Sequence, residues 1–411
     1  FDWEKAFPEV FTSGAKGGFK AVIGNPPYIQ LSMADYYDDF INKYFLSVFK
    51  FSMGRLNTFG LFIYMSLIKL ISNKGLMSFI IPNTLLTQEG YRSLRRELLK
   101  HKIINITNYK YPVFQDAVVE TIVFVVEKSF NEKNQIVIVD YDNETKRIDS
   151  HTISQNEYRI TYNNSFMVNV DKKMLTLKQK IDENRSILKS FANINQAIAL
   201  KHNRNKYLSN EKLADNYKPV IDGRNINRYK LVWDNQYLAY DVNNIHSCKR
   251  TDIFESAEKI FFRRVGDRII ATYDNNQFYA LNTLVVITFK IKVSFSIKYL
   301  LGLLNSSLLN FYYVTYLKST KRDFSEIQAR QIAQLPIHVC DINNIEKTKQ
   351  HDDIVVLVEH MLKLHERTPI TPYEKEQLDR EIAATDAQID RLVYDLYGLT
   401  EEEIKIVEGE N

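Results

Sequence analysis

The distribution of apolar residues predicts alternating strands and helices over the first 140 residues. Short apolar runs rich in β-branched residues indicate strands, and apolar residues spaced three and four apart indicate helices. Strands are predicted at residues 19–24, 75–82, 102–109, 118–128 and 135–142. Helices are predicted at residues 36–51, 56–72 and 87–101. Helices alternating with buried strands indicate an α/β sheet. We expect the strand at 135–142 to pair with that at 118–128 through the polar turn between them.

The pattern changes near residue 160. A predicted helix from Asp171 to Asn184 leads into short strands and polar turns, which are typical of an α+β domain. An apolar segment at residues 296–317 predicts a further helix, and the polar region beyond it has helical spacing that ends at Gly398. We therefore predict four parts: a first domain at 1–160, a connector at 161–185, a second domain at 186–340 and a helical region at 341–411.

Composition adds little to this picture. Of the 411 residues, 45% are hydrophobic and 25% are charged, which is typical of globular proteins. A net charge of +4 does not by itself indicate a nucleic-acid partner. The chain has no signal peptide and no apolar run of bilayer length, so we expect a cytoplasmic protein. Cys248 and Cys340 match no metal-binding spacing, so we expect no metal site.

The most informative stretch is FKAVIGNPPYIQ, in which an apolar strand stops at Asn25-Pro26-Pro27-Tyr28. Two successive prolines cannot donate ladder hydrogen bonds, so the strand must end there. The stiff turn would place the carboxamide oxygen of Asn25 beside the carbonyl of Pro26, and both groups accept hydrogen bonds. Two acceptors can hold an amino group and localise its lone pair, while Tyr28 stacks on the ring. The turn therefore predicts a site for methylating an exocyclic amine.

This turn resembles the catalytic motif of DNA methyltransferases that act on the N6 atom of adenine. The wider resemblance is to type IIG restriction–modification enzymes, and it rests on GGFKAVIGNPPYI, LFIYMSLIKLISNKGLMSFIIPNTLL and YPVFQDAVVETIVFVVEK. A second resemblance is to a TaqI-like specificity domain, which reads the DNA sequence. It rests on the segments IDGRNINRYK, FFRRVGDRIIATYD and LLGLLNSSLLNFYY. The resemblance implies part of a doubly wound, Rossmann-like methyltransferase sheet, then an α+β target-recognition domain and carboxy-terminal helices.

The resemblance also implies roles for individual residues. Asn25 and the Pro26 carbonyl would accept the adenine amino group, and Tyr28 and Phe114 would sandwich the base after it is flipped from double-stranded DNA. S-adenosylmethionine would supply the methyl group. Phenylalanine in a strand is usually a core residue, so base contact and packing both stay open for Phe114.

The chain departs from the family pattern in two places. Relatives often carry an acid where this chain has Lys20, and the family's glycine loop for the cofactor does not precede the catalytic turn. Gly14, Gly17 and Gly18 precede a strand rather than follow one, so we interpret them as a turn. We therefore expect the carboxy-terminal portion of a longer enzyme, with the upstream polypeptide as a partner, and no activity from the 411-residue chain alone.

Basic residues in the second domain are candidates for DNA contact, although each could equally be a solvated surface charge. They are Arg224, Arg228, Lys249, Arg250, Arg263, Arg264, Lys321 and Arg322. The polar basic loop at residues 201–206 is either a DNA-reading loop or solvent-facing.

Other functions remain open on sequence alone. The triplets Glu144-Thr145-Lys146 and Glu403-Ile404-Lys405 fit part of a nuclease pattern, but so short a match assigns no cutting activity. A DNA-recognition module without catalysis is the main alternative. Amino methylation of RNA or of protein glutamine is a third possibility, against which the resemblance to the specificity domain argues.

Overall fold

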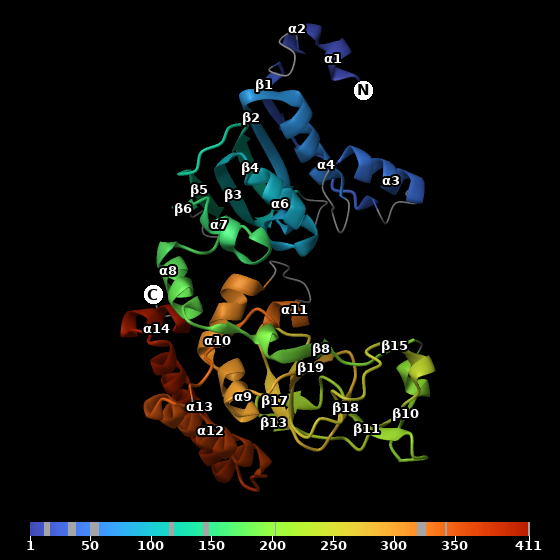
Figure 1. The fold of residues 1–411 in the computed structure, drawn as a ribbon, viewed down its shortest axis with the longest axis vertical. Helices are drawn as coiled ribbons and strands as arrows, with labels where there is room; N and C mark the ends of the chain where they lie inside the picture. The colour runs from blue at the N-terminus through green and yellow to red at the C-terminus, as the bar shows by residue number, and fades with distance from the viewer. Residues whose placement is uncertain are drawn as a thin grey trace. The chain divides into compact units, whose positions relative to one another are not determined.

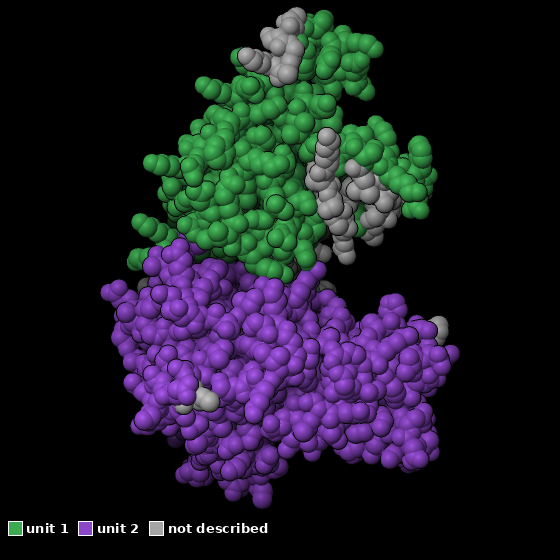
Figure 2. Space-filling view, viewed as in Figure 1, with its two compact units in different colours: residues 1–173, 319–321 green, residues 174–318, 322–411 purple. Residues whose placement is uncertain are grey.

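The computed structural model describes residues 1–11, 17–31, 38–49, 57–114, 119–142, 148–201, 203–318, 326–341 and 343–409. The chain divides into two compact units (Figure 2). Unit 1 comprises residues 1–173 and 319–321, and unit 2 comprises residues 174–318 and 322–411. Within the described ranges, no helix has the length and apolar character needed to cross a membrane.

Unit 1 is built on a six-stranded mixed sheet (Figure 1). β1 is parallel to β2, and β3 is parallel to β5, whereas β4 runs antiparallel to both of its neighbours. The carboxyl ends of β1, β2, β3 and β5 therefore lie at one edge of the sheet. In spatial order the strands are β1 (Phe19–Gly24), β2 (Ile71–Pro82), β4 (Glu120–Glu127), β3 (Lys102–Pro112), β5 (Gln135–Tyr141) and β6 (Ile148–Ser154).

The α/β prediction is confirmed, but the predicted pairing of β5 with β4 is wrong. β5 instead pairs in parallel with β3, from Asn105↔Val137 to Tyr109↔Tyr141. The reason is that β4 already uses both of its edges, one for β2 and the other for β3. The polar turn after β4 therefore carries the chain past β3 to the free side of that strand.

The two faces of this sheet differ in burial. Met77, Phe79 and Phe124 belong to one face and are at most 4% exposed. Ile23 belongs to the other face and is 84% exposed, and Leu76 on the same face is 40% exposed. In the part of the chain that the structure describes, no strand pairs with the outer edge of β1.

The helices of unit 1 connect these strands. The helix predicted at 56–72 is confirmed as far as Leu70, where its last turn is π-helical, and it stops because β2 begins at Ile71. The buried guanidinium of Arg95 donates to the carbonyl oxygens of Leu85, Gln88 and Asn163. The helical segments are α1 (Trp3–Ala6), α2 (Pro8–Phe11), α3 (Asp39–Val48), α4 (Thr58–Met65), η3 (Ser66–Leu70), α5 (Thr84–Thr87), η4 (Glu89–Tyr91), α6 (Arg92–Leu98), α7 (Glu157–Ile160) and η5 (Tyr162–Asn164).

Unit 2 contains two small four-stranded sheets, as the short strands in the sequence predict. The first has the order β17 (Ala271–Asp274), β16 (Lys259–Arg263), β19 (Leu284–Phe289) and β8 (Ala192–Gln196). The second has the order β10 (Leu208–Ser209), β14 (Tyr237–Ala239), β11 (Tyr217–Ile221) and β18 (Tyr279–Ala280). Three two-stranded pairs complete the strands: β12 (Ile226–Asn227) with β13 (Lys230–Leu231), β9 (Ala199–Leu200) with β15 (Ile245–Ser247), and β7 (Ser186–Ile187) with β20 (Pro336–Ile337).

The helices of unit 2 include the predicted carboxy-terminal region. The predicted end at Gly398 is confirmed, because this residue adopts the left-handed conformation (φ 69°) directly after α13. Short helical turns lie at η6 (Leu188–Ser190), η7 (Arg204–Lys206) and η8 (Val242–Asn244). The longer segments are α8 (Lys172–Asp182), α9 (Ile297–Asn305), α10 (Ser307–Tyr312), η9 (Tyr313–Leu317), α11 (Ala329–Ile332), α12 (Ile345–Glu366), α13 (Pro372–Tyr397) and α14 (Glu401–Glu408).

Candidate active site and DNA-recognition residues

The NPPY turn begins at the carboxyl end of β1. Gly24 pairs with Phe79 of β2, and a Cβ atom on Gly24 would lie 3.4 Å from the Phe79 ring. Directly after it, Asn25 is exposed, whereas Pro26 is buried and Tyr28 is half-buried. The turn therefore anchors its first proline in the protein and presents the carboxamide of Asn25 to solvent.

Tyr28 fixes the carboxamide of Asn25. The Tyr28 hydroxyl donates to Asn25 Oδ1 at 2.8 Å and lies 3.1 Å from the carbonyl oxygen of Ile80. Burial raises the pKa of Tyr28, so the hydroxyl keeps its proton and remains a donor. A carboxamide oxygen has two lone pairs, and this contact leaves one of them for a further donor.

Thr58 closes the turn from a different segment, and the sequence analysis missed it. The hydroxyl of Thr58 donates to the Pro27 carbonyl and accepts from the Ile29 amide, with an N–O distance of 3.0 Å. The Thr58 amide donates in turn to the Ile29 carbonyl at 3.0 Å. Thr58 is the first residue of α4, so the amino end of this helix fixes the path of the chain after the two prolines.

Phe114 lies at the same edge of the sheet as the NPPY turn. β3 ends at Pro112, and its carboxyl end lies on the side where β1 also ends. β2 and β4 separate β3 from β1, a spacing of about 14 Å at the usual distance between strands. Phe114 is half-buried.

A second aromatic group at this edge was not predicted. The rings of Tyr109, Tyr111 and Tyr141 contact one another, with centroids 5.7 to 6.0 Å apart. The three residues stand at the ends of β3 and β5, and all are half-buried. Their contact depends on the pairing of β3 with β5, which the sequence pattern did not predict.

The predicted DNA-binding residues differ in what they contact. Arg224 pairs with Asp222, Arg250 with Asp252 and Arg264 with Glu326. Arg228 forms two 2.7 Å hydrogen bonds with Asp386 of α13 and a third with the Asn305 carbonyl, and Arg263 donates to Asn227. Lys249 is exposed. Lys321 and Arg322 lie outside the described residues, as does His202 of the basic loop.

Comparison with protein families finds a match within each unit. Residues 1–114 match the Eco57I restriction-modification methylase family, and residues 218–337 match the TaqI-like C-terminal specificity domain. Residues 1–114 are thus similar to a restriction–modification methylase, and residues 218–337 to a TaqI-like specificity domain. Both parts stand in the order that the sequence predicts, so the predicted family is confirmed.

Individual relatives agree with this assignment. A protein of Methanocaldococcus jannaschii, named as type II restriction enzyme and methyltransferase RM.MjaORFECS2P, is 29% identical over 352 residues. That match covers 80% of this chain but only 28% of the relative, so the chain spans about a quarter of that protein's length.

Solved structures show a similar fold. The type IIL restriction–modification enzyme MmeI in complex with DNA has a TM-score of 0.54 at 13% identity, over 95% of this chain and 56% of MmeI. The ATP-dependent type ISP enzyme LlaBIII bound to DNA has a TM-score of 0.50 at 10% identity, over 89% of this chain and 31% of LlaBIII.

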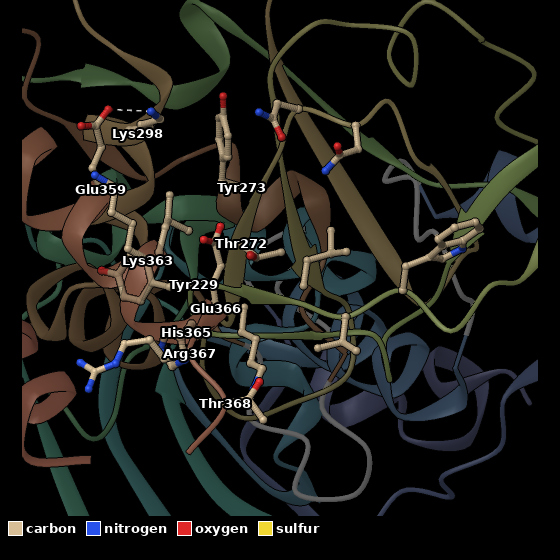
Figure 3. Close-up of a pocket in the computed structure, with 17 residues that line it drawn as sticks. Tyr229, Thr272, Tyr273, Lys298, Glu359, Lys363, His365, Glu366, Arg367 and Thr368 are labelled. Carbon is tan, nitrogen blue, oxygen red and sulfur yellow. Dashed lines mark hydrogen bonds and ion pairs between the residues drawn. The ribbon is translucent and has the colours of Figure 1, made fainter. Parts of the chain in front are cut away.

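A cavity of about 870 Å³ lies between the specificity domain and α12 (Figure 3). Its wall carries cationic and anionic side chains together, and Lys298 is already paired with Glu359 at 2.6 Å. Tyr273 and Trp233 add aromatic surface. Its lining residues include none of the predicted site residues.

The two nuclease-like triplets gain no support as a cutting site. Residues 144–146 lie outside the described residues. In α14, Glu403 accepts from the amide of Thr400 and forms a 2.6 Å ion pair with Lys180. Its carboxylate therefore caps a helix and ties α14 to α8.

Proposed function

We propose that this chain is the adenine-methylating and DNA-reading portion of a type IIG restriction–modification enzyme that acts in the cytoplasm in defence against phage. The observation that carries the proposal is the exposed carboxamide of Asn25, held by Tyr28 at the carboxyl end of β1. The carboxyl edge of an open α/β sheet is where such folds bind ligands. The matched methylase family supports the same reaction class.

The chemistry requires an activated amino group rather than a strong base. Adenine N6, flipped from the duplex, would donate its two hydrogens to Asn25 Oδ1 and to the Pro26 carbonyl. Two acceptors draw the N–H bonds out of the ring plane, so the nitrogen lone pair becomes available to attack a methyl carbon. Tyr28 and Phe114 would then hold the base by stacking, which contributes about 1–3 kcal/mol per contact.

S-adenosylmethionine would supply the methyl group, and the packing of the glycines supports a main cofactor-binding loop elsewhere. The glycine pair before β1 is closely packed: a Cβ atom on Gly17 would lie 2.8 Å from Phe11 Cα. Gly18 donates its amide to the Val10 carbonyl, as expected of a turn. We therefore propose that the main cofactor-binding loop lies in the upstream polypeptide.

The free side of β1 supports the upstream polypeptide as a partner. β1 stands at the edge of its sheet, and its residue Ile23 is 84% exposed. An additional strand beside β1, with helices over the more exposed face, would complete a doubly wound sheet and bury these apolar side chains.

The main alternative is a DNA-recognition module without catalysis. It predicts that the longer protein binds no S-adenosylmethionine, whereas the methylase predicts that it does. RNA or protein glutamine as the substrate is disfavoured by the match of residues 218–337 to a DNA-specificity family.

Asn25→Ala tests the proposed reaction in the full-length parent protein. We expect methylation of duplex DNA to fall by about 10² or more, because one of two acceptors on the amino group is lost. The measurement is the N6-methyladenine content of the genome, position by position, in cells that carry the parent or the variant. DNA binding by the purified variant should stay near the parent value.

Asn131→Ala, in the turn between β4 and β5, is the matched control and should methylate normally. Full methylation by Asn25→Ala would exclude the proposed mechanism. Methyl transfer by the isolated 411-residue chain would exclude the proposed need for upstream residues.

A further inference from the structure

The carboxylate of Asp222 is buried and contacts the guanidinium of Arg224 side-on, through Nε and one terminal nitrogen. The residue follows β11 and is only 3% exposed. Arg224 Nε lies 3.1 Å from Asp222 Oδ1, and Arg224 Nη2 lies 3.0 Å from Asp222 Oδ2. Arg204 of η7 approaches the same carboxylate, with Nη1 3.4 Å from Oδ2.

The turn around Asp222 is held by hydrogen bonds, so the carboxylate has a fixed position. The Asp222 amide donates to Asn225 Oδ1 at 2.8 Å, and Asn225 Nδ2 donates to the Val232 carbonyl at 2.9 Å. The Gly223 amide donates to Thr283 Oγ1 at 2.8 Å. Burial alone would raise the pKa of Asp222, but the hydrogen bonds from Arg224 bring it below its usual value, so the carboxylate is charged at neutral pH.

The contact with Asp222 leaves one edge of Arg224 available. A guanidinium has five donors, and the Asp222 carboxylate takes the side formed by Nε and Nη2. The end formed by Nη1 and Nη2 stays available, and the Arg224 side chain is 68% exposed. This end is the one that forms paired hydrogen bonds with N7 and O6 of guanine.

Four other arginines of the specificity domain lack this combination. Arg228 uses both terminal nitrogens on Asp386, and Arg264 uses one on Glu326 and the other on the Asn282 carbonyl. Arg250 is paired from the side like Arg224, but its partner Asp252 is 64% exposed, so solvent competes for that contact. Arg263 donates through Nη2 to the side chain of Asn227, which is no anchoring carboxylate.

We propose that Arg224, fixed by Asp222, reads a guanine in the DNA recognition sequence, and that Arg204 holds the adjoining DNA phosphate. Asp222 is a positioning residue for this contact. The loop that carries Arg204 also contains Lys201 and Lys206 and has no acidic residue between positions 201 and 206, which suits a phosphate partner. The proposal rests on the proposed DNA substrate and adds a residue that determines specificity.

The test measures sequence discrimination by the full-length parent, with binding and methylation read separately. Arg224→Ala should lose roughly 5- to 150-fold of its discrimination at one guanine position and keep it elsewhere. Replacing that guanine with 7-deazaguanine removes the N7 acceptor, so it should weaken binding by the parent and have little further effect on the variant. Asp222→Asn should lower discrimination at the same position.

Arg380→Ala removes an exposed arginine of α13 that pairs with Glu376 and lies outside residues 218–337, so it is the matched control and should leave the recognised sequence unchanged. Arg224→Lys keeps the positive charge but lacks the two terminal nitrogens that form the paired hydrogen bonds. It should also lose discrimination at the guanine, and because it keeps a long basic side chain, this loss would not be a result of misfolding. A uniform loss of affinity for all sequences in Arg224→Ala, or a recognition sequence without guanine, would overturn the proposal. A parent that binds its sequence but does not methylate it would contradict the proposed reaction and still test this contact.

Discussion

Single hydrogen bonds determine the geometry of the proposed catalytic turn. Thr58 contacts the chain on both sides of Tyr28, through the Pro27 carbonyl and the Ile29 amide. Thr58→Val keeps the shape of the side chain and removes both contacts, so the turn should relax. We expect single-turnover methylation by the full-length parent to fall about tenfold to 10²-fold, since small misplacements of reacting groups have effects of this size.

Thr58→Ser is the control for this prediction, because it keeps the hydroxyl and should retain most of the activity. Equal rates for the valine and serine variants would show that the hydroxyl does not position the turn. Both variants should bind DNA as the parent does, because Thr58 lies in unit 1 and not in the specificity domain.

At the residue scale, the sequence predicted those candidates that form a local motif. Asn25 to Tyr28 are adjacent in the chain, and two prolines define their turn. Thr58 could not be predicted, because its contact depends on residues 27–29 meeting the start of a helix 30 positions later. Asp222 and Arg224 are neighbours in the sequence, but only the structure shows that the carboxylate is buried.

Close approach between helices gives a prediction at the element scale. Gly302 of α9 faces α12, and a Cβ atom there would lie 2.9 Å from Val358 Cγ2 and 3.0 Å from Ile354 Cγ2. Gly302→Ala should therefore lower the free energy of unfolding of unit 2 by about 1–3 kcal/mol, as overpacking usually does. Thermal or chemical denaturation measures the change.

Val358→Ala provides the matched comparison. In the double variant it removes the methyl group that the new Cβ would meet, so part of the stability lost in Gly302→Ala should return. If Gly302→Ala left the free energy of unfolding unchanged, α9 and α12 would be able to move apart with little loss of free energy.

The pairing of elements was harder to predict than their existence. Five of the six described strands of unit 1 were predicted from their apolar runs, because a buried strand needs such residues whichever neighbour it has. β6 was missed, since Ile153 is the one buried residue among its seven. The neighbour of β5 was not found, since apolar content does not reveal that β4 is already flanked by β2 and β3. Long-range pairing is set by the whole sheet rather than by one turn.

At the scale of the whole molecule, His338 links stability to pH. It is 6% exposed, and its amide and carbonyl groups lie 3.1 Å from the hydroxyls of Tyr397 and Tyr299 respectively. Burial lowers the pKa of His338 to about 4, so the unfolded chain binds a proton more readily than the folded chain between pH 6.5 and pH 4. Stability should therefore decline as pH falls through this range, by at most about 3 kcal/mol from this residue.

Chemical denaturation between pH 7.5 and pH 4.5 measures this effect. His338→Gln should be less stable at neutral pH and should lose less stability on acidification. His360→Gln, at an exposed position of α12, should follow the unaltered chain. An identical pH dependence in His338→Gln would contradict the assignment.

The overall composition predicted least about the whole molecule. A net charge of +4 is unremarkable, yet residues 201–206 carry three basic side chains and no acidic one. Averages over 411 residues hide such local clusters. The family resemblance predicted more about the fold and the function, because it rested on motifs in a fixed order along nearly the whole chain. The predicted boundaries at residues 160, 185 and 340 stay predictions.

The unpaired side of β1 has a practical consequence for anyone who produces this polypeptide. Since no described strand pairs with this side, the amide and carbonyl groups next to Ile23 form a template for another copy of the chain, so molecules should join edge to edge and precipitate as their concentration rises. The yield of soluble protein in expression trials would then depend less on how well the core is packed than on whether another strand covers this edge of β1.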